Sequence, residues 1–227
     1  DRKFLGAVVD LRQALTFAFT DDAHMQTALV EDWIHGDQSP RITKEAIKYG
    51  AHIEVLSFDF DLSDHANGRM NEQLFKQIVN ELTPHTLLRG AVYYTTRGGL
   101  RALIPLEKHY QVSTESGADW KALYTQIAST LPTSNQGTWD LGCGDVPRLY
   151  RLPRVVRDGE AQNGWFYVPQ KVNRYYLTKQ DREAILNASL TRSANHSAIK
   201  GTGLIEFFDE INLLGDEHTE INGYPSY

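Results

Sequence analysis

The order of hydrophobic patterns between residues 53 and 106 constrains the fold of this chain more than any other feature. Residues 53–60 (IEVLSFDF) are rich in the residues that favour a strand, and residues 69–82 have helical spacing. Two more strands are predicted at 91–96 and 100–106, separated by the Arg97-Gly98-Gly99 turn of a β-hairpin. The apolar stripe of the helix comprises Leu74, Phe75, Ile78, Val79 and Leu82. A strand, a helix and a hairpin are therefore expected in succession.

Helical spacing returns at 118–131, and short strands are expected after it. These strands are predicted around Trp139 and at 148–153, 165–169 and 174–177. The resulting order βαββαβ, with further strands, predicts an α+β fold in which helices pack on one face of a mainly antiparallel sheet.

The N-terminal part of the chain is expected to add further elements. Residues 12–35 have the scattered apolar positions of mixed helical material. A loop from Ser39 then leads through an N-cap at Thr43 into a short helix that ends near Gly50.

The C-terminal part is expected to be helical. Thr178 and Asp181 have the spacing of a capping box, which predicts a helix from there to about Arg192. A second helix is predicted at 203–214. We therefore expect one domain over residues 1–178, with its core at about 50–170, and a helical appendage over 179–227.

Composition excludes several classes of protein. A single cysteine, Cys143, excludes an internal disulfide framework and a multi-cysteine zinc site, and the eight histidines lack zinc-site spacing, so no zinc is expected. No apolar run approaches the roughly 18 residues that span a bilayer, and a signal peptide is not recognisable, so we expect a cytoplasmic protein without a membrane partner. The net charge of −6 argues against a wide nucleic-acid-binding surface.

The motifs of common nucleotide-binding and hydrolytic enzymes are missing from the sequence. It contains no P-loop lysine motif, no G-x-S-x-G elbow and no G-x-G-x-x-G turn. A start at Asp1 rather than Met suggests a fragment of a longer protein.

The acidic pair Asp59 and Asp61 ends the first predicted strand. Side chains alternate along a strand, so the two carboxylates point to one face and Phe60 points to the other. Carboxylate oxygens are the ligands that Mg²⁺ and Mn²⁺ prefer, and two such ions stabilise both oxygens of a phosphoryl transfer. The alternative is a chance pair of acids in a chain rich in aspartate.

The hairpin segment 95–101 (TTRGGLR) has the composition of a phosphate-binding loop. Glycines allow backbone N–H groups to approach a phosphate, and the arginine and threonine side chains add hydrogen bonds. The alternative is a glycine turn with solvated arginines.

A third segment, 139–153, offers another carboxylate and more arginines. The carboxylate is Asp140 or Asp145, and we favour Asp140 because it follows a short apolar strand. If 148–153 is a strand, Arg148 and Tyr150 face one way and Leu149 and Arg151 the other. The alternative is a turn that leads into an amphipathic edge strand.

Taken in this order, the three segments resemble the three motifs of the archaeo-eukaryotic primase (AEP) superfamily, and in particular the primase-polymerase domains of phage and plasmid replication proteins. Asp59 and Asp61 resemble the first motif, two acids one residue apart at a strand end. Residues 96–101 resemble the second, a Gly-rich hairpin that ends in a basic residue. Asp140, followed by Arg-Leu-Pro within 148–153, resembles the third.

The resemblance covers about residues 50–170 and has one departure. The family usually has histidine at the end of its second motif, where this chain has Arg101. Arginine can hold a phosphate with two hydrogen bonds but is a poor proton donor, so nucleotide binding survives this change more easily than proton transfer.

The resemblance implies an RRM-like sheet and a DNA primase-polymerase, a nucleotidyltransferase that makes or extends primers on single-stranded DNA from NTPs or dNTPs. It implies two Mg²⁺ or Mn²⁺ ions held by Asp59, Asp61 and Asp140. Family analogy implies a helicase domain or other replication proteins as partners, in a bacterial, archaeal or phage-infected cell. The residues expected to bind nucleotide are Thr96, Arg97, Gly98, Gly99, Arg101, Arg148 and Arg151.

Two other functions are compatible with the same residues. One is a non-catalytic replication initiator or nucleic-acid-binding module, which would be insensitive to loss of Asp59 and Asp61. The other is a metal-dependent nuclease or phosphoesterase, which would degrade DNA without consuming nucleotides. A base could stack on Tyr150 or Trp165, and the sequence does not choose between them.

Overall fold

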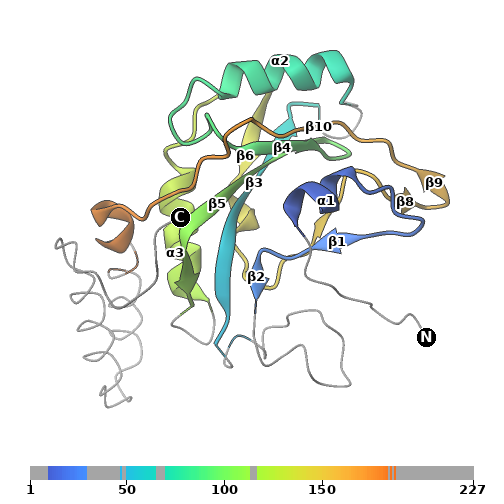
Figure 1. Cartoon of the computed structure of the whole chain (residues 1–227). Coiled ribbons are helices and arrows are strands. Elements are labelled where there is room, and N and C mark those ends of the chain that lie inside the picture. The colour runs from blue at the N-terminus through green and yellow to red at the C-terminus, as the bar shows by residue number, and fades with distance from the viewer. Residues whose placement is uncertain are drawn as a thin grey trace, which may run out of the picture. The chain divides into compact units, whose positions relative to one another are not determined.

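A computed structural model describes residues 10–29, 47, 50–64, 70–112, 117–183, 185 and 187. The centre of the described part is an antiparallel sheet (Figure 1). The strands of its main path are, in spatial order, β10 (Phe166–Tyr167), β4 (Val92–Thr95), β5 (Gly99–Gln111), β3 (His52–Leu62) and β2 (Ala28–Leu29). A sixth strand, β6 (Gly137–Asp140), pairs with the C-terminal half of β3 on the same edge as β2.

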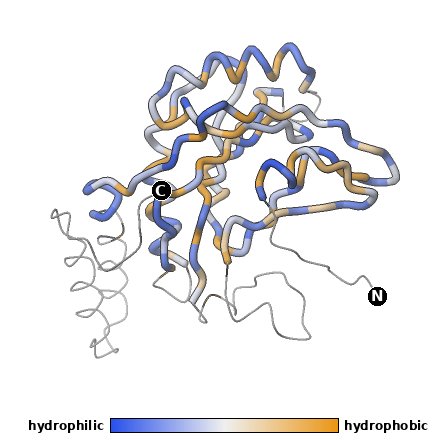
Figure 2. The backbone as a smooth tube through the Cα atoms, viewed as in Figure 1, coloured by the Kyte–Doolittle hydropathy of each residue, from blue (hydrophilic) through white to orange (hydrophobic). Residues whose placement is uncertain are grey.

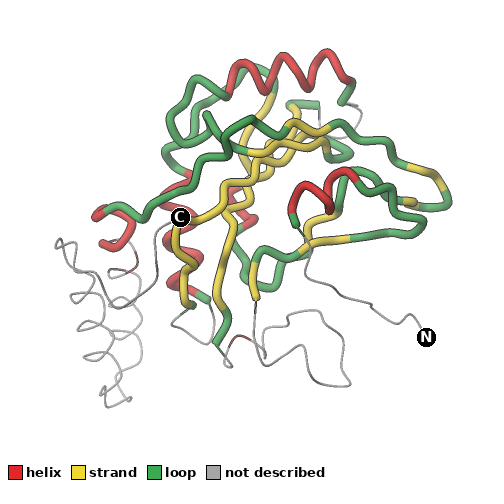
Figure 3. The backbone as a smooth tube through the Cα atoms, in the orientation of Figure 1, coloured by secondary structure: helices red, strands yellow, loops and turns green. Residues whose placement is uncertain are grey.

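The predicted order of the core elements is confirmed. Along the chain, β3 is followed by α2 (Glu72–Leu82), β4, β5, α3 (Ala118–Ala128) and β6. Helix α2 begins after Asn71, whose side chain accepts a hydrogen bond from the Leu74 amide at 2.8 Å. The hairpin turn closes where the Thr96 N–H donates to the Gly99 carbonyl at 2.9 Å. Figure 3 shows the strands gathered between the helices.

One face of the sheet is covered by the two long helices. Phe58 on β3 stacks on Tyr124 of α3, with ring centroids 5.1 Å apart. Hydrophobic and hydrophilic residues alternate along α2 in Figure 2, and the buried ones belong to its predicted apolar stripe. This face forms because Leu56, Phe58, Phe60 and Leu62 alternate with polar residues along β3.

The opposite face is also covered, which corrects the expectation that helices pack on one face alone. Helix α1 (Leu11–Thr16) buries Ala14 and Leu15 against Val92, Tyr94 and Leu103 of the sheet. Of the predicted mixed helical segment 12–35, the described residues up to 29 contain the rest of helix α1, then β1 (His24–Met25) and β2. Two-residue strands such as these are too short to show an alternating pattern in the sequence.

The segment after β6 has less regular structure than predicted. A 3-10 helix, η3 (Leu141–Cys143), follows β6, and the predicted strand 148–153 is reduced to β7 (Tyr150–Arg151), which pairs with β1. Next comes a small hairpin formed by β8 (Val156–Arg157) and β9 (Glu160–Ala161). The predicted strand 174–177 is a single parallel bridge between Tyr175 and Leu106. The prolines that flank β7 limit its length, because proline lacks an N–H for a strand ladder.

The start of the C-terminal helix is confirmed at Thr178. The Thr178 amide donates to Asp181 Oδ2 at 2.7 Å, and the Asp181 amide donates back to Thr178 Oγ1 at 3.2 Å. Residues 179–183, 185 and 187 are helical, but the rest of the expected appendage, including 203–214, lies outside the described residues. The predicted loop and helix before Gly50 also lie outside them, apart from Ile47 and Gly50 itself. Among the helices described, none has the length and hydropathy needed to cross a membrane.

Candidate functional site

Four polar side chains form a row across four strands of the sheet. Asp59 on β3 is paired with Arg101 on β5 and with Asp140 on β6, and Arg101 is paired with Tyr94 on β4. Directly paired residues of antiparallel strands point to the same face. This row lies on the face that α1 partly covers, since Tyr94 belongs to the apolar cluster beneath that helix.

The three acids predicted from the sequence share this face at one end of β3. Asp61 lies two residues after Asp59 on the same strand, so its side chain leaves the same face. Asp140 joins them because β6 pairs with β3 in a register that places it opposite Asp59. Residues distant in the sequence are thus brought to one end of the sheet.

Arg101 forms a buried ion pair with Asp59. Its Nε donates to Asp59 Oδ1, and its Nη2 donates to Oδ2 at 2.8 Å. Arg101 is 8% exposed, and its Nη1 donates to Tyr94 Oη at 2.7 Å and to the Arg151 carbonyl at 3.3 Å. The guanidinium carbon also lies 5.4 Å from the ring centroid of Tyr94 and 4.7 Å from that of Tyr150.

Cys143 lies between two of the acids. Its Sγ is 3.3 Å from Asp59 Oδ2 and 3.2 Å from Asp140 Oδ2. Burial, followed by the charge of Asp59, raises the pKa of this thiol, so Cys143 stays protonated and can donate to a carboxylate. The side chain is buried, with an exposed fraction of 1%.

The structure distinguishes the two candidates for the third acid. Burial opposes ionisation of Asp140, but the Gly142 amide at 2.7 Å, the Cys143 thiol and the charge of Arg148 outweigh it and lower the Asp140 pKa. Asp145 instead points outward, where its carboxylate is 3.4 Å from Arg148 Nη2 and 3.9 Å from Lys121 Nζ. Asp140 therefore shares the row with Asp59, and Asp145 belongs to a surface ion-pair group.

Two glycines allow the neighbouring strands to approach β3 closely at Asp61. A Cβ on Gly99 would lie 1.8 Å from the Phe60 carbonyl oxygen, and one on Gly137 would lie 2.1 Å from the Asp61 carbonyl oxygen. Gly99 is paired with Asp61, so the 96–99 turn lies at the same end of β3 as the acids. Within that turn Arg97 is exposed, whereas Gly98 and Gly99 are buried.

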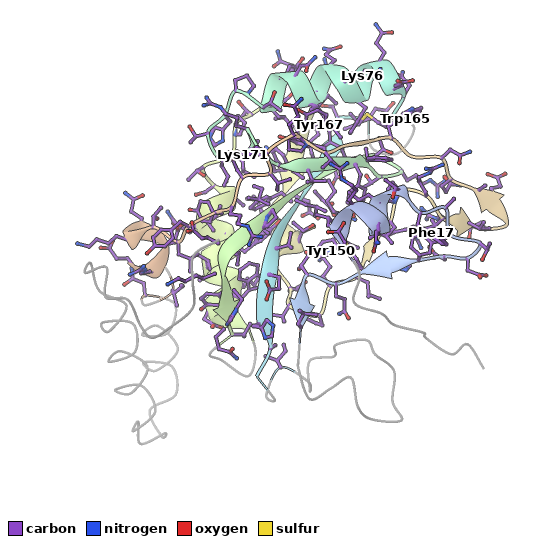
Figure 4. All side chains as sticks on the ribbon, viewed as in Figure 1. Phe17, Lys76, Tyr150, Trp165, Tyr167 and Lys171 are labelled. Atoms are coloured by element: carbon purple, nitrogen blue, oxygen red, sulfur yellow. The ribbon has the colours of Figure 1, made fainter. Side chains whose placement is uncertain are left out.

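The remaining predicted arginines have protein partners. Arg148 Nη2 donates to the Gly142 carbonyl at 2.8 Å, which keeps this arginine beside the Asp140 turn. Arg151 forms two hydrogen bonds to Asp22, at 2.7 and 2.8 Å. The two aromatic candidates also differ, because Tyr150 is 3% exposed and Trp165 is 36% exposed. Figure 4 labels both residues.

Several residues around the acids were not identified from the sequence. Tyr94 is the cross-strand partner of Arg101, and the hairpin turn would have indicated this pairing. Tyr150 and Cys143 are linked by a hydrogen bond from Tyr150 Oη to the Cys143 carbonyl at 3.0 Å. Asp22 has no local sequence signal, because it reaches Arg151 only through the β1–β7 pairing.

The donor chemistry of the cluster fits a divalent cation. Asp59 Oδ2 and Asp140 Oδ2 both contact the Cys143 sulfur, so the two carboxylates converge on that side chain. An ionised carboxylate has about four lone-pair positions, so the three hydrogen bonds that Asp59 accepts from Arg101 and Cys143 leave about one for a cation. In the described part of the chain, however, no three acidic, histidine or cysteine side chains already converge as a metal-binding group. Asp61 projects from the same face of β3 and is the third candidate ligand.

Comparisons of this chain with models of protein families, with curated proteins and with solved structures find no match.

Proposed function

We propose that this chain is the catalytic domain of a DNA primase-polymerase of the archaeo-eukaryotic type, with the RRM-like core of that family. One observation carries the proposal. The register of β6 against β3 brings Asp140 opposite Asp59, on the face from which Asp61 also projects. This grouping of acids from two motifs is what a metal-dependent nucleotidyl transfer requires.

Asp59, Asp61 and Asp140 would hold the Mg²⁺ or Mn²⁺ ions. Such ions, when bound, lower the pKa of an attacking hydroxyl and stabilise the charge that develops on the phosphates. The lowered pKa of Asp140 keeps this carboxylate ionised near neutral pH. The buried Cys143 thiol and the strands on either side exclude water from the inner side of the cluster.

The 96–99 turn would bind the phosphates of an incoming NTP or dNTP. Its position beside Asp61 supports this assignment, because triphosphate and acids must meet at the ions. Arg97 is exposed and charged there, with Thr96 beside it. Arg148, beside Asp140, is the next candidate for a phosphate contact, whereas Arg151 would first have to leave Asp22.

Single-stranded DNA would be the template, and Trp165 is the better candidate for stacking on a base. Trp165 is exposed and is attached to the hairpin by the bond from its N–H to Thr95 Oγ1, at 3.0 Å. Tyr150 is unsuited because it is buried beneath Arg101. A helicase or another replication protein in the cytoplasm would be the natural partner of such a domain.

The test is incorporation of labelled nucleotides on single-stranded DNA, with and without a primer, in Mg²⁺ or Mn²⁺. Asp61→Asn is the informative variant, because it removes a predicted ligand without leaving the buried Arg101 unpaired. Metal-dependent products that are lost in Asp61→Asn support the proposal, and products without a primer identify a primase. DNA binding without incorporation would favour the binding module, and degradation of the DNA would favour a nuclease.

A further inference from the structure

Arg101 occupies the motif position that was expected to contact nucleotide phosphates, yet its donors face the protein. Nε and Nη2 bond to Asp59, and Nη1 bonds to Tyr94 and to the Arg151 carbonyl. The side chain is 9% exposed. A phosphate could reach it only if Asp59 gave up two charge-assisted hydrogen bonds.

The surroundings of Arg101 hold the guanidinium in one orientation. The Tyr94 hydroxyl and the Arg151 carbonyl fix one end of the guanidinium, and the rings of Tyr94 and Tyr150 pack against it. A planar, immobilised guanidinium that binds both carboxylate oxygens also fixes the plane of that carboxylate. Asp59 is therefore held with Oδ2 directed toward Cys143 and Asp140.

We propose that Arg101 is a positioning residue that orients Asp59 toward Asp140 for cation binding, and that it does not bind nucleotide phosphate. This role rests on the proposed function, because it concerns the same cation site. The two arginines of the hairpin then have different tasks. Arg101 orients an acid from within the sheet, and Arg97 in the turn is left to contact phosphate. Residues that orient a metal ligand typically contribute about 10–100-fold to metal affinity or activity.

A double-mutant cycle tests this role. Arg101→Gln, Asp59→Asn and the double variant are compared with the unaltered chain in equilibrium binding of Mn²⁺, measured by electron paramagnetic resonance, and in steady-state incorporation of nucleotides. If Arg101 acts only through Asp59, Arg101→Gln weakens Mn²⁺ binding by about tenfold or more, and the double variant is no worse than Asp59→Asn. The KM for nucleotide changes by less than about twofold in Arg101→Gln, and Arg97→Gln raises it.

Controls separate folding from function. Arg157→Gln removes an arginine that pairs with Asp158 on the surface hairpin and should change none of these values. Tyr94→Phe keeps the Arg101–Asp59 pair but removes one support of Arg101, so a smaller loss of Mn²⁺ affinity is expected even if Arg101→Gln does not fold. Additive effects of Arg101→Gln and Asp59→Asn on Mn²⁺ binding would overturn the positioning role, and so would a raised KM for nucleotide in Arg101→Gln with unchanged Mn²⁺ binding. Neither result would contradict the proposed function. An unaltered chain that binds Mn²⁺ but incorporates no nucleotide would instead contradict the proposed function.

Discussion

The ion pair between Arg101 and Asp59 lies almost entirely inside the protein, with side chains 9% and 16% exposed. Removing one member of such a pair leaves the other charge without a counter-ion in a site that water reaches poorly. The pair is also linked to Tyr94 and Cys143 by hydrogen bonds, so a substitution at one of these four positions alters the hydrogen bonding of the others. Stability and site geometry are therefore coupled at this pair.

Arg101→Gln is expected to lower the free energy of unfolding by about 3–5 kcal/mol, because Asp59 loses its counter-ion. The measurement is urea denaturation followed by tryptophan fluorescence. The double variant of Arg101→Gln and Asp59→Asn should lose less unfolding free energy than the sum of the two single variants, since no buried charge is then left unpaired. A loss of less than about 1 kcal/mol in Arg101→Gln would show that water reaches this pair freely.

Acid is expected to destabilise the fold through Asp22 and Asp140. The Arg151 hydrogen bond lowers the pKa of Asp22, and the Asp140 pKa is lowered as described above. A carboxyl with a folded-state pKa below its unfolded value contributes stability above about pH 4, which is lost as the pH falls through the folded-state pKa. Unfolding free energies measured between pH 6 and pH 3 should therefore fall less steeply in Asp22→Asn and Asp140→Asn. Equal slopes in all three proteins would contradict this assignment.

At the scale of single elements, the sequence was most informative where a pattern is long. Helix α2, strand β4 and the start of β5 were predicted close to their observed bounds, because each has several apolar residues at the spacing of its element. Strand β5 continues to Gln111, beyond the predicted end at 106. The sequence did not indicate this extension because Glu107, Lys108 and His109 interrupt the apolar pattern. Strands β1, β2 and β7 have two residues each, and their pairing depends on contacts distant in sequence.

The candidate site was predictable only in part for the same reason. Asp59 and Asp61 could be placed on one face from strand alternation alone. The position of Asp140 opposite Asp59 depends on the β3–β6 register. The burial of Arg101 depends on the rings of Tyr94 and Tyr150. The sequence therefore suggested a phosphate ligand at position 101, where the structure has an ion pair with Asp59.

Gly99→Ala is expected to disrupt the contact between β3 and β5, because the added Cβ would meet the Phe60 carbonyl oxygen at 1.8 Å. Neither strand can move away without breaking ladder hydrogen bonds, so we expect a loss of stability of about 3 kcal/mol or more, at the upper end of overpacking effects. The matched control is Gly159→Asn, at a φ of 82° that asparagine tolerates and with no atom within 4 Å of the added Cβ. Thermal unfolding of both variants gives the comparison, and equal melting temperatures would contradict the close packing.

At the scale of the whole molecule, exposed aromatic residues indicate where a template strand would lie. Trp165 and Tyr167 are 36% and 41% exposed, just before and within the edge strand β10, and Figure 4 labels both together with Lys171. Tyr167 is paired with Tyr93, so its ring projects to the face of the sheet opposite the acids, and a strand stacked there would have to pass around the β10 edge to reach them. Given the net charge of −6, stacking would have to supply much of the affinity for single-stranded DNA.

Trp165→Ala is expected to weaken binding of single-stranded DNA by about 1–3 kcal/mol, the contribution of one stacked base. Fluorescence anisotropy of a labelled oligonucleotide measures this loss, and Tyr167→Ala should show a similar or smaller one. Phe17→Ala is the comparison, because Phe17 is 60% exposed and follows α1, which covers part of the face that carries the acids. Loss of affinity in Phe17→Ala alone would place the template on that face.

If acids from two separate motifs form one catalytic site, Asp140→Asn and Asp145→Asn should differ sharply in activity. Both replacements remove one negative charge from the same short segment, and the amide oxygen introduced by Asp140→Asn can still accept the hydrogen bond from the Gly142 N–H. In Mn²⁺-dependent incorporation of nucleotides on primed single-stranded DNA, Asp140→Asn should lose activity by about 100-fold or more, as expected for a metal ligand. Asp145→Asn should keep activity close to that of the unaltered chain. Full activity in Asp140→Asn, or loss confined to Asp145→Asn, would show that Asp140 does not act with Asp59 and Asp61 in one catalytic site.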